Sequence, residues 1–404
     1  MNTTDHDRIA RWLTLQGLTG ASELDLLVGF CERCWAAGLQ ISRGLAIIDT
    51  LHPVYEGRAF AWRRDGAVNS PVTEYRSTAG GPEADNWQRT AFYHLLTTDA
   101  DEVRRRIGFG DPLDFLLLDR MQEEGQTDYF AMVQRFTVDG SIGEMDGLYS
   151  HWVSAEPDGF GDDDIAALRR LVPILALAIK CASLARITST LAEIYLGADA
   201  GALVLSGRIS RGVAERIAAV LWFSDLRDYT RISENAAPDE IIPLLNDYAD
   251  AVISSIHEAG GTVLKLMGDG ILAIFRSEQP EEACTMALVA ERALRARLVG
   301  LAERRAVEGR PVTEVYLGLH IGEVFYGNIG SQERLDFTVV GPAVNEVGRI
   351  ASMCRSTDRA LLISEDFAAA LPPAQRTALV SVGRYALRGV RRPRELFTLD
   401  PDIG

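Results

Sequence analysis

Two apolar, strand-like runs meet at a Gly-Asp-Gly turn in the second half of the chain, and this pattern limits the possible folds more than any other. Residues 260–275 read Gly-Gly-Thr-Val-Leu-Lys-Leu-Met-Gly-Asp-Gly-Ile-Leu-Ala-Ile-Phe. A short glycine-containing connection between two such runs is typical of a β-hairpin. The pattern therefore predicts a hairpin that carries Asp269 at its tip.

A further buried strand is predicted upstream, at residues 218–223, where Ala-Ala-Val-Leu-Trp-Phe forms a continuous apolar run. Asp225 follows it and lies at the carboxyl end of the strand. Two carboxylates at the strand ends of one sheet suit a pair of divalent cations, whereas each aspartate alone is more often a turn residue. We interpret Asp225 and Asp269 together as candidate metal ligands.

Residues 337–350 read Phe-Thr-Val-Val-Gly-Pro-Ala-Val-Asn-Glu-Val-Gly-Arg-Ile, which is typical of a strand, a turn and a helix. Asn345 and Arg349 are four residues apart, and a helix places such a pair on one face. They can therefore address one ligand, although a solvated surface pair is the alternative that the spacing alone leaves open.

Five segments, in this order, resemble the motifs of class III nucleotidyl cyclases, and the resemblance covers about residues 216–400. The segments are residues 223–230, 265–270, 318–324, 327–330 and 337–350. The resemblance implies an α+β fold, with a ferredoxin-like, palm-type catalytic domain at residues 216–404.

The resemblance also implies roles for residues of this chain. Asp225 and Asp269 would hold two Mg²⁺ or Mn²⁺ ions, with the backbone carbonyl of Leu226 as a further ligand. Lys265 and Thr338 would read the base. An ammonium donor beside a hydroxyl acceptor suits the edge of adenine, so this pair favours ATP over GTP.

The remaining substrate residues follow from the same resemblance. Asn345 would position the ribose, Arg349 would neutralise charge on the α-phosphate, and Arg388 would contact the terminal phosphates. Tyr229 and Thr230 open a predicted helix whose first amides can receive phosphate oxygens.

The implied reaction is that of an adenylate cyclase, in which the ribose 3′-oxygen attacks the α-phosphorus of ATP and pyrophosphate leaves. In the family, one subunit supplies the metal-binding half of each site and its partner supplies the base-reading half, so we expect a head-to-tail homodimer. A nucleotide-binding module without catalysis and a guanylate cyclase are the alternatives, and Lys265 argues against the second.

Two positions depart from the family pattern. Asp228 replaces the usual glycine of the phosphate loop, although aspartate tolerates positive φ better than most residues. Tyr316 stands where many relatives carry an arginine. The added negative charge of Asp228 should weaken triphosphate binding. Both changes reduce the compensation of negative charge at the phosphates, so we expect them to affect turnover rate more than reaction type.

The first half predicts a separate α+β module. We expect two helices within residues 5–38 with Ser22 as an N-cap, a helix at 112–124, and strands at 41–51, 58–64, 128–138 and 145–153. Residues 159–173 resemble the last helix of GAF domains, which are regulatory ligand-binding modules. This predicts a GAF-like domain at 1–187, with an unidentified signal, and a helical signalling linker at 188–215. A PAS-like domain or another α+β fold is the alternative for the first of these.

Composition excludes some functions. The 41 basic and 57 acidic side chains give a net charge of −16, which disfavours nucleic acid as a partner. Residues 1–7 lack the basic and apolar regions of a secretory signal, and the apolar run at 171–177 is too short to span a bilayer. The sequence thus predicts a cytoplasmic protein without membrane insertion. Cys31 and Cys34 are interpreted as buried structural residues rather than a redox pair.

Overall fold

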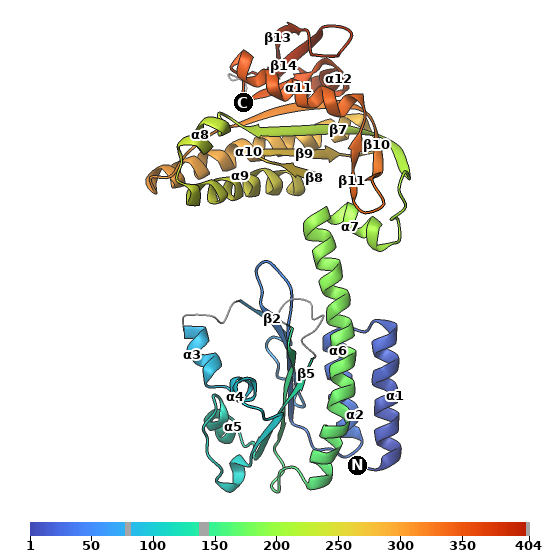
Figure 1. The fold of residues 1–404 in the computed structure, drawn as a ribbon, viewed down its shortest axis with the longest axis vertical. Helices are drawn as coiled ribbons and strands as arrows, with labels where there is room; N and C mark the ends of the chain where they lie inside the picture. The colour runs from blue at the N-terminus through green and yellow to red at the C-terminus, as the bar shows by residue number, and fades with distance from the viewer. Residues whose placement is uncertain (77–81, 137–144, 401–404) are drawn as a thin grey trace. The chain divides into compact units, whose positions relative to one another are not determined.

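The computed structural model describes residues 1–76, 82–136 and 145–400. The chain divides into two compact units, Met1–Leu191 and Ala192–Gly404 (Figure 1), which we call the N-terminal and C-terminal units.

The N-terminal unit is built on a six-stranded antiparallel sheet with the strand order β3-β2-β1-β6-β5-β4. Its strands are β1 (Arg43–Asp49), β2 (Gly57–Arg63), β3 (Val72–Tyr75), β4 (Glu102–Arg105), β5 (Asp128–Arg135) and β6 (Gly147–Ser154). Its helices are α1 (Thr3–Thr19), α2 (Glu23–Ala36), α3 (Pro82–Gln88), α4 (Ala91–Thr97), α5 (Leu118–Glu123) and most of α6 (Asp162–Leu196), with a 3₁₀ turn at Ile107–Phe109.

Helices cover both faces of this sheet because successive strand side chains point to opposite faces. In β1, Ala46 and Ile48 join the core formed with α1, α2 and α6. Leu45 and Ile47 pack against the second core, which α4 and α5 cover. The two helix layers thus bury alternate residues of one strand.

Several expected elements of this unit are present. Ser22 caps α2 and accepts a hydrogen bond from the amide of Asp25 at 3.2 Å. Cys31 and Cys34 are buried within α2, and burial raises the pKa of both thiols. The strand expected at 128–138 ends at Arg135, and residues 137 and 138 lie outside the described residues.

The helix expected at 112–124 is shorter than predicted. Only Leu118–Glu123 is helical, because Leu117 has a φ of 77° and a left-handed residue cannot continue a right-handed helix. Pro173, in contrast, does not end α6, which spans 35 residues in all and continues to Leu196. The expected boundary between the GAF-like domain, at 1–187, and the linker, at 188–215, therefore falls within one helix.

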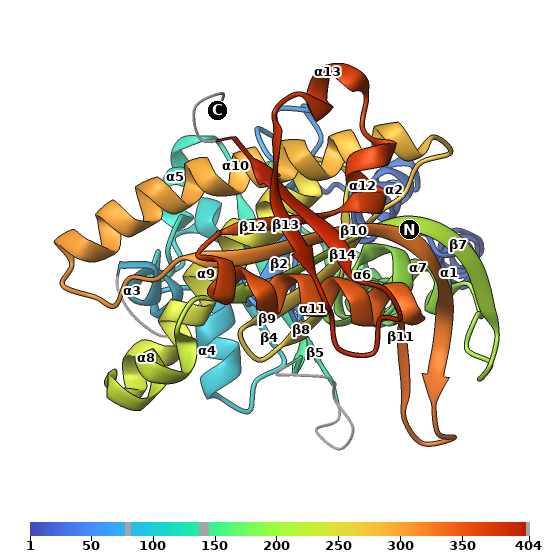
Figure 2. The ribbon, with the colours of Figure 1, turned by 90° about the horizontal axis from the view of Figure 1, so that it is seen from above.

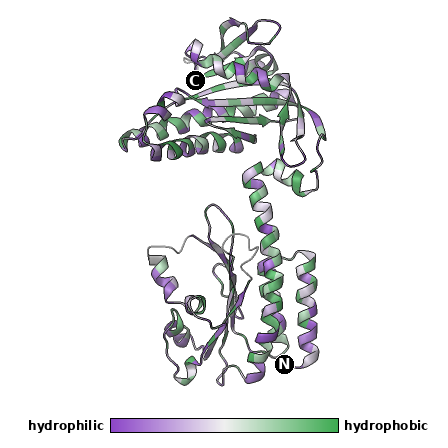
Figure 3. Cartoon of the chain, viewed as in Figure 1, coloured by the Kyte–Doolittle hydropathy of each residue, from purple (hydrophilic) through white to green (hydrophobic). Residues whose placement is uncertain are grey.

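Helix α6 also passes a test of length and composition for a membrane span, with a mean hydropathy of 1.7 over its most apolar window. Figure 3 shows apolar residues along much of this helix. Core helices pass the same test, and Leu168, Leu171 and Leu175 of α6 are buried in the core of the N-terminal unit. Length and composition alone therefore do not assign a membrane role to α6.

The C-terminal unit contains an eight-stranded sheet with the order β13-β14-β12-β10-β7-β9-β8, and β11 pairs with β10 off this path. The strands are β7 (Ala214–Leu226), β8 (Thr262–Met267), β9 (Gly270–Phe275), β10 (Val315–Gly330), β11 (Leu335–Val340), β12 (Leu361–Ser364), β13 (Leu379–Tyr385) and β14 (Arg394–Leu399). The helices are α7 (Ala198–Leu205), α8 (Tyr229–Asn235), α9 (Pro238–Glu258), α10 (Pro280–Val307), α11 (Pro342–Thr357), α12 (Glu365–Ala370) and α13 (Pro373–Arg376).

The centre of this unit has the ferredoxin-like arrangement. Strand β7, helix α9, strands β8 and β9, helix α10 and strand β10 follow one another as β-α-β-β-α-β, and the strands lie in the order β10-β7-β9-β8. Val220 and Trp222 of β7 face the core with α9 and α10, whereas Ala219 and Leu221 face α11 and α7. Figure 2 shows α11 lying along the sheet that its residues help to bury.

Candidate active site

Asp225 and Asp269 are brought together by the central strands. Asp225 is the penultimate residue of β7, and Asp269 lies in the two-residue turn between β8 and β9, where Gly268 has a φ of 67°. Because β9 pairs with β7 through Ile271 and Ser224, the turn lies beside the end of β7. The two carboxyl groups are within hydrogen-bonding distance.

This proximity changes the electrostatics of the pair. Burial, and the contact with the neighbouring Asp269 carboxyl, raise the pKa of Asp225 to about 7. The amide of Leu226 donates a hydrogen bond to the Asp225 carboxylate, which acts in the opposite direction. Two carboxylates that oppose each other's ionisation form a donor set that a divalent cation would stabilise.

The pair lines a cavity of about 210 Å³. Apolar side chains of α9, including Ile242, Leu245 and Val252, form its other wall. Oxygen ligands at one end of such a cavity fit Mg²⁺ or Mn²⁺, which favour carboxylate and carbonyl oxygens. The residues present therefore fit the metal site expected from the sequence.

The loop after β7 accommodates Asp228 in two ways. Its φ of 55° is the left-handed conformation that glycine usually adopts, as expected. Its carboxylate lies 3.3 Å from the guanidinium of Arg355 and 3.8 Å from that of Arg231. The added negative charge that we expected to weaken phosphate binding thus has two arginines beside it.

Tyr229 and Thr230 are the first two residues of α8. Tyr229 packs against the core, and Thr230 is exposed and accepts a hydrogen bond from Ser233 through its carbonyl. Tyr316 is almost fully buried and lies opposite Asp225 in the β7–β10 pairing. The contacts among the described residues do not bring the side chains of Tyr229 or Thr230 to the aspartate pair.

Lys265 occupies the exposed end of β8 and forms an ion pair with Asp336 on β11. The register of β8 against β9 shifts between Val263 and Lys265, and such a bulge re-aims the side chains that follow it. Thr338 lies two residues after Asp336 on the same face of β11. The structure thus adds Asp336, which the sequence reasoning missed, to the Lys265 and Thr338 pair.

Asn345 and Arg349 lie one turn apart on α11, as the spacing predicted. Asn345 is exposed, and Arg349 points to the loop after β13. A Cβ atom added to Gly389 would lie 3.4 Å from one Arg349 guanidinium nitrogen. Arg388, directly before Gly389, is exposed, so the two expected phosphate-binding arginines are carried by neighbouring segments.

A second polar cluster lies beneath α11. His320, Glu346 and Asp366 bring ligand-type atoms within 4.8 Å of one another. The guanidinium of Arg394 lies 2.9 Å from Glu346 and 3.6 Å from Asp366, so a cation already neutralises these carboxylates. We therefore interpret the cluster as support for α11, and the sequence offered no signal for it.

Within one chain, the expected site residues form three separate groups. These groups are the aspartate pair, the Lys265–Asp336 pair and the Arg349–Gly389 contact. Among the described residues, no hydrogen bond or ion pair joins one group to another.

Residues 214–401 match the family model of the adenylate and guanylate cyclase catalytic domain. This segment is therefore similar to cyclase catalytic domains. The catalytic domain expected at 216–404 begins two residues after the start of this match.

Two curated relatives are adenylate cyclases. The adenylate cyclase of Anabaena cylindrica is 34% identical over 157 residues, which cover 39% of this chain and 31% of that protein. Adenylate cyclase 1 of Rhizobium meliloti (strain 1021) is 30% identical over 164 residues, which cover 39% of this chain and 24% of that protein. The similarity thus spans less than a third of either relative.

Among solved structures, the adenylyl cyclase CyaB from P. aeruginosa is 24% identical, with a TM-score of 0.42. The match covers 48% of this chain and 100% of that chain.

Proposed function

We propose that this chain is an adenylate cyclase that converts ATP to 3′,5′-cyclic AMP and pyrophosphate at sites shared by two copies. The observation that carries the proposal is the contact between Asp225 and Asp269 in a cyclase domain whose adjoining hairpin strand carries Lys265. Together they combine an acidic cation site with an ammonium group suited to adenine.

The base is read by Lys265 and Thr338. The Lys265 ammonium donates a hydrogen bond to adenine N1, and the Thr338 hydroxyl accepts one from the exocyclic amine. Asp336 holds the ammonium in place before the base arrives, because the two side chains form an ion pair. Guanine presents the opposite donor and acceptor polarity at this edge.

The sugar and phosphates are held by residues on and near α11. Asn345 orients the ribose so that its 3′-oxygen lies in line with the α-phosphorus, and Arg349 neutralises the charge that develops on the α-phosphate. Arg388 binds the terminal phosphates. The first residues of α8, Tyr229 and Thr230, place backbone amides near the phosphate chain.

Asp225, Asp269 and the carbonyl of Leu226 would hold two Mg²⁺ or Mn²⁺ ions. When bound, such ions lower the pKa of the attacking hydroxyl and stabilise charge on the attacking and departing oxygens. The two carboxylates of the chain fix their position, and the apolar wall of α9 limits the access of water from that side.

A head-to-tail homodimer completes each site. The three groups of site residues are separate within one chain, so a second copy is needed to supply the base-reading and ribose-binding side chains to the aspartate pair. Exposed apolar side chains on the hairpin strands support such an interface. These include Leu266 and Met267 on β8, Phe325 on β10 and Val340 on β11.

The first half of the chain would act as a GAF-like regulatory domain at 1–187, followed by a helical signalling linker at 188–215. The support is an antiparallel sheet between two helix layers and a helix, α6, that continues beyond Leu191. We propose a cytoplasmic location, and the signal is a small molecule or another input that the sequence does not specify.

The test is to incubate the purified full-length chain with ATP or GTP and Mn²⁺, and to identify products by chromatography. Cyclic AMP from ATP, with little cyclic GMP from GTP, is the expected result. Cyclic GMP as the main product would overturn the assignment of the base. Nucleotide binding without either product would favour a non-catalytic signalling module.

A further inference from the structure

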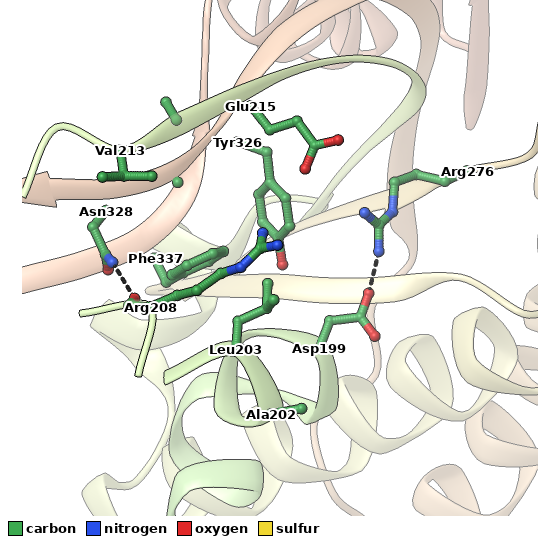
Figure 4. A pocket seen from close by; sticks show the side chains of 12 residues that line it. Asp199, Ala202, Leu203, Arg208, Val213, Glu215, Arg276, Tyr326, Asn328 and Phe337 are labelled. Atoms are coloured by element: carbon green, nitrogen blue, oxygen red, sulfur yellow. Dashed lines mark hydrogen bonds and ion pairs between the residues drawn. The ribbon is translucent and has the colours of Figure 1, made fainter. Parts of the chain in front are cut away.

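The C-terminal unit contains a second cavity, of about 340 Å³, away from the aspartate pair (Figure 4). It is bounded by α7 and the segment that follows it, by the start of β7 and by the ends of β9, β10 and β11. Its volume lies at the lower end of the range for small-molecule sites. The proposed catalytic roles use none of the residues that line it.

Most of the inner wall is apolar and aromatic. The rings of Tyr326 and Phe337 meet edge to face, with centroids 4.8 Å apart. Leu203 from α7 and Val213 from the following segment face the same space in Figure 4. Such a wall suits a flat ring, which packs against aromatic edges and aliphatic groups.

Some polar groups of the wall are already satisfied. The carboxylate of Asp199 accepts hydrogen bonds from Arg276 at 2.5 Å and from the Thr262 hydroxyl at 3.1 Å. The side-chain amide of Asn328 donates to the backbone carbonyl of Arg208 at 2.7 Å. These contacts fix the walls.

Two donors in the wall lack an acceptor among the described residues. The hydroxyl of Tyr326 has no hydrogen-bond partner, although the residue is only 3% exposed. The guanidinium of Arg208 has no ion pair or hydrogen bond there. Glu215 is the one lining acid without an ion pair in the described chain, and it is exposed to solvent at the edge of the sheet. Arg208 is also exposed, so the buried unfilled group of the wall is the Tyr326 hydroxyl, and the Arg208 guanidinium lies at the solvent side of the cavity.

We propose that this cavity binds a small aromatic carboxylate. Its ring packs against Phe337 and Leu203, and its carboxylate accepts hydrogen bonds from Arg208 and Tyr326. A guanidinium binds a carboxylate through two parallel hydrogen bonds, which gives the site its preference for an anion.

The cavity is connected to the base-reading residues through β11. Phe337 lies between Asp336 and Thr338, and alternate residues of a strand face opposite sides. A ligand that packs on Phe337 thus contacts the strand that carries those two side chains. This link to catalysis rests on the proposed function, whereas binding itself does not.

The experiment measures binding to the full-length chain by isothermal titration calorimetry, with 1-naphthoate and its neutral counterpart 1-naphthamide as probes. We expect naphthoate to bind at least about tenfold more tightly than naphthamide. Arg208→Ala should abolish that difference, and Tyr326→Phe should reduce it. Ala202→Trp, which fills the cavity from α7, should prevent binding of both probes.

Arg211→Ala is the matched control, because Arg211 lies in the same segment but does not line the cavity. Truncation of Arg208 leaves its backbone carbonyl available to Asn328, and circular dichroism would check the fold of each variant. Equal affinity for the two probes, no binding of naphthoate at millimolar concentration, or equal effects of the Arg208 and Arg211 variants would overturn the proposal. Calorimetry needs no turnover, so a failure here is distinct from a failure of the cyclase proposal.

Discussion

The ammonium of Lys265 is paired with the carboxylate of Asp336 across two strands that are 71 residues apart in the chain. The ion pair fixes the side chain that we propose as the reader of adenine. Removing Asp336 therefore differs from removing Lys265. The first change leaves the ammonium group in place but no longer holds it, whereas the second removes the group that would bind the base.

Lys265→Glu should lower kcat/KM for ATP by about 10- to 100-fold, because a charge-assisted hydrogen bond to the base is lost and a carboxylate faces adenine N1. Asp336→Asn should cause a smaller loss, mainly as a higher KM. Steady-state kinetics with ATP and GTP would measure both. Lys180→Glu is the matched control, since Lys180 lies in the N-terminal unit, and an equal loss in this variant would contradict the assignment.

Asp225→Asn and Arg349→Ala should each reduce cyclic AMP formation by at least about 100-fold, because each removes charge stabilisation from the transition state. A mixture of the two variants should recover part of the activity through one intact composite site in a mixed dimer. Asp225→Asn mixed with Asp269→Asn should not recover, since both changes affect the same half-site. Recovery of activity in both mixtures, or in neither, would argue against active sites shared between two copies of the chain.

Mn²⁺ should raise the unfolding temperature of the wild-type chain, and EDTA should reverse the effect, because a ligand that binds only the folded state stabilises it. In metal-free buffer at pH 8, Asp225→Asn should unfold a few degrees above wild type. The raised pKa of Asp225 means that its ionised form is disfavoured in the folded state, so removing the charge relieves that cost. Differential scanning fluorimetry measures both effects. If Mn²⁺ raises the unfolding temperature of Asp225→Asn as much as that of wild type, Asp225 is not a ligand of the ion.

His151 should make the N-terminal unit sensitive to acid. It is buried and stacked on Phe92, with ring centroids 5.8 Å apart, and burial lowers its pKa to about 3. Below its usual pKa of 6.5, the unfolded chain binds a proton that the folded chain excludes, so stability falls as the pH falls. At pH 5.5 the loss should be about 1 kcal/mol relative to pH 7.5.

Urea unfolding of the chain, monitored by a spectroscopic signal from the N-terminal unit, would measure this loss of stability. His151→Phe should show less of it because the ring remains and the titrating group is gone. His257→Gln, which changes an exposed histidine of α9, is the control and should behave as wild type. A His151→Phe chain that loses as much stability as wild type would show that other groups dominate.

Local sequence patterns were sufficient to predict elements that depend only on neighbouring residues. The hairpin with Asp269 at its tip follows from glycine conformation and apolar runs, and the N-cap at Ser22 follows from one side chain and one amide. The ferredoxin-like centre followed from a family resemblance rather than from periodicity.

The features that sequence reasoning missed depend on distant segments. Asp336 gains its partner only when β11 comes beside β8, and Arg355 reaches Asp228 only after α11 docks on the sheet. The helix expected at 112–124 was wrong over its first half, because apolar spacing does not reveal the left-handed turn at Leu117. The GAF-like assignment, the roles of the site residues and the shared dimer stay predictions.

Gly389 has a φ of 73° and lies against the guanidinium of Arg349. Any other residue there would be strained, and a long side chain would compete with the arginine for space. In the adenylate cyclase that we propose, substitution of this glycine would therefore leave every motif residue in place and still reduce turnover. Inspection of the motif residues alone would classify such a variant as intact.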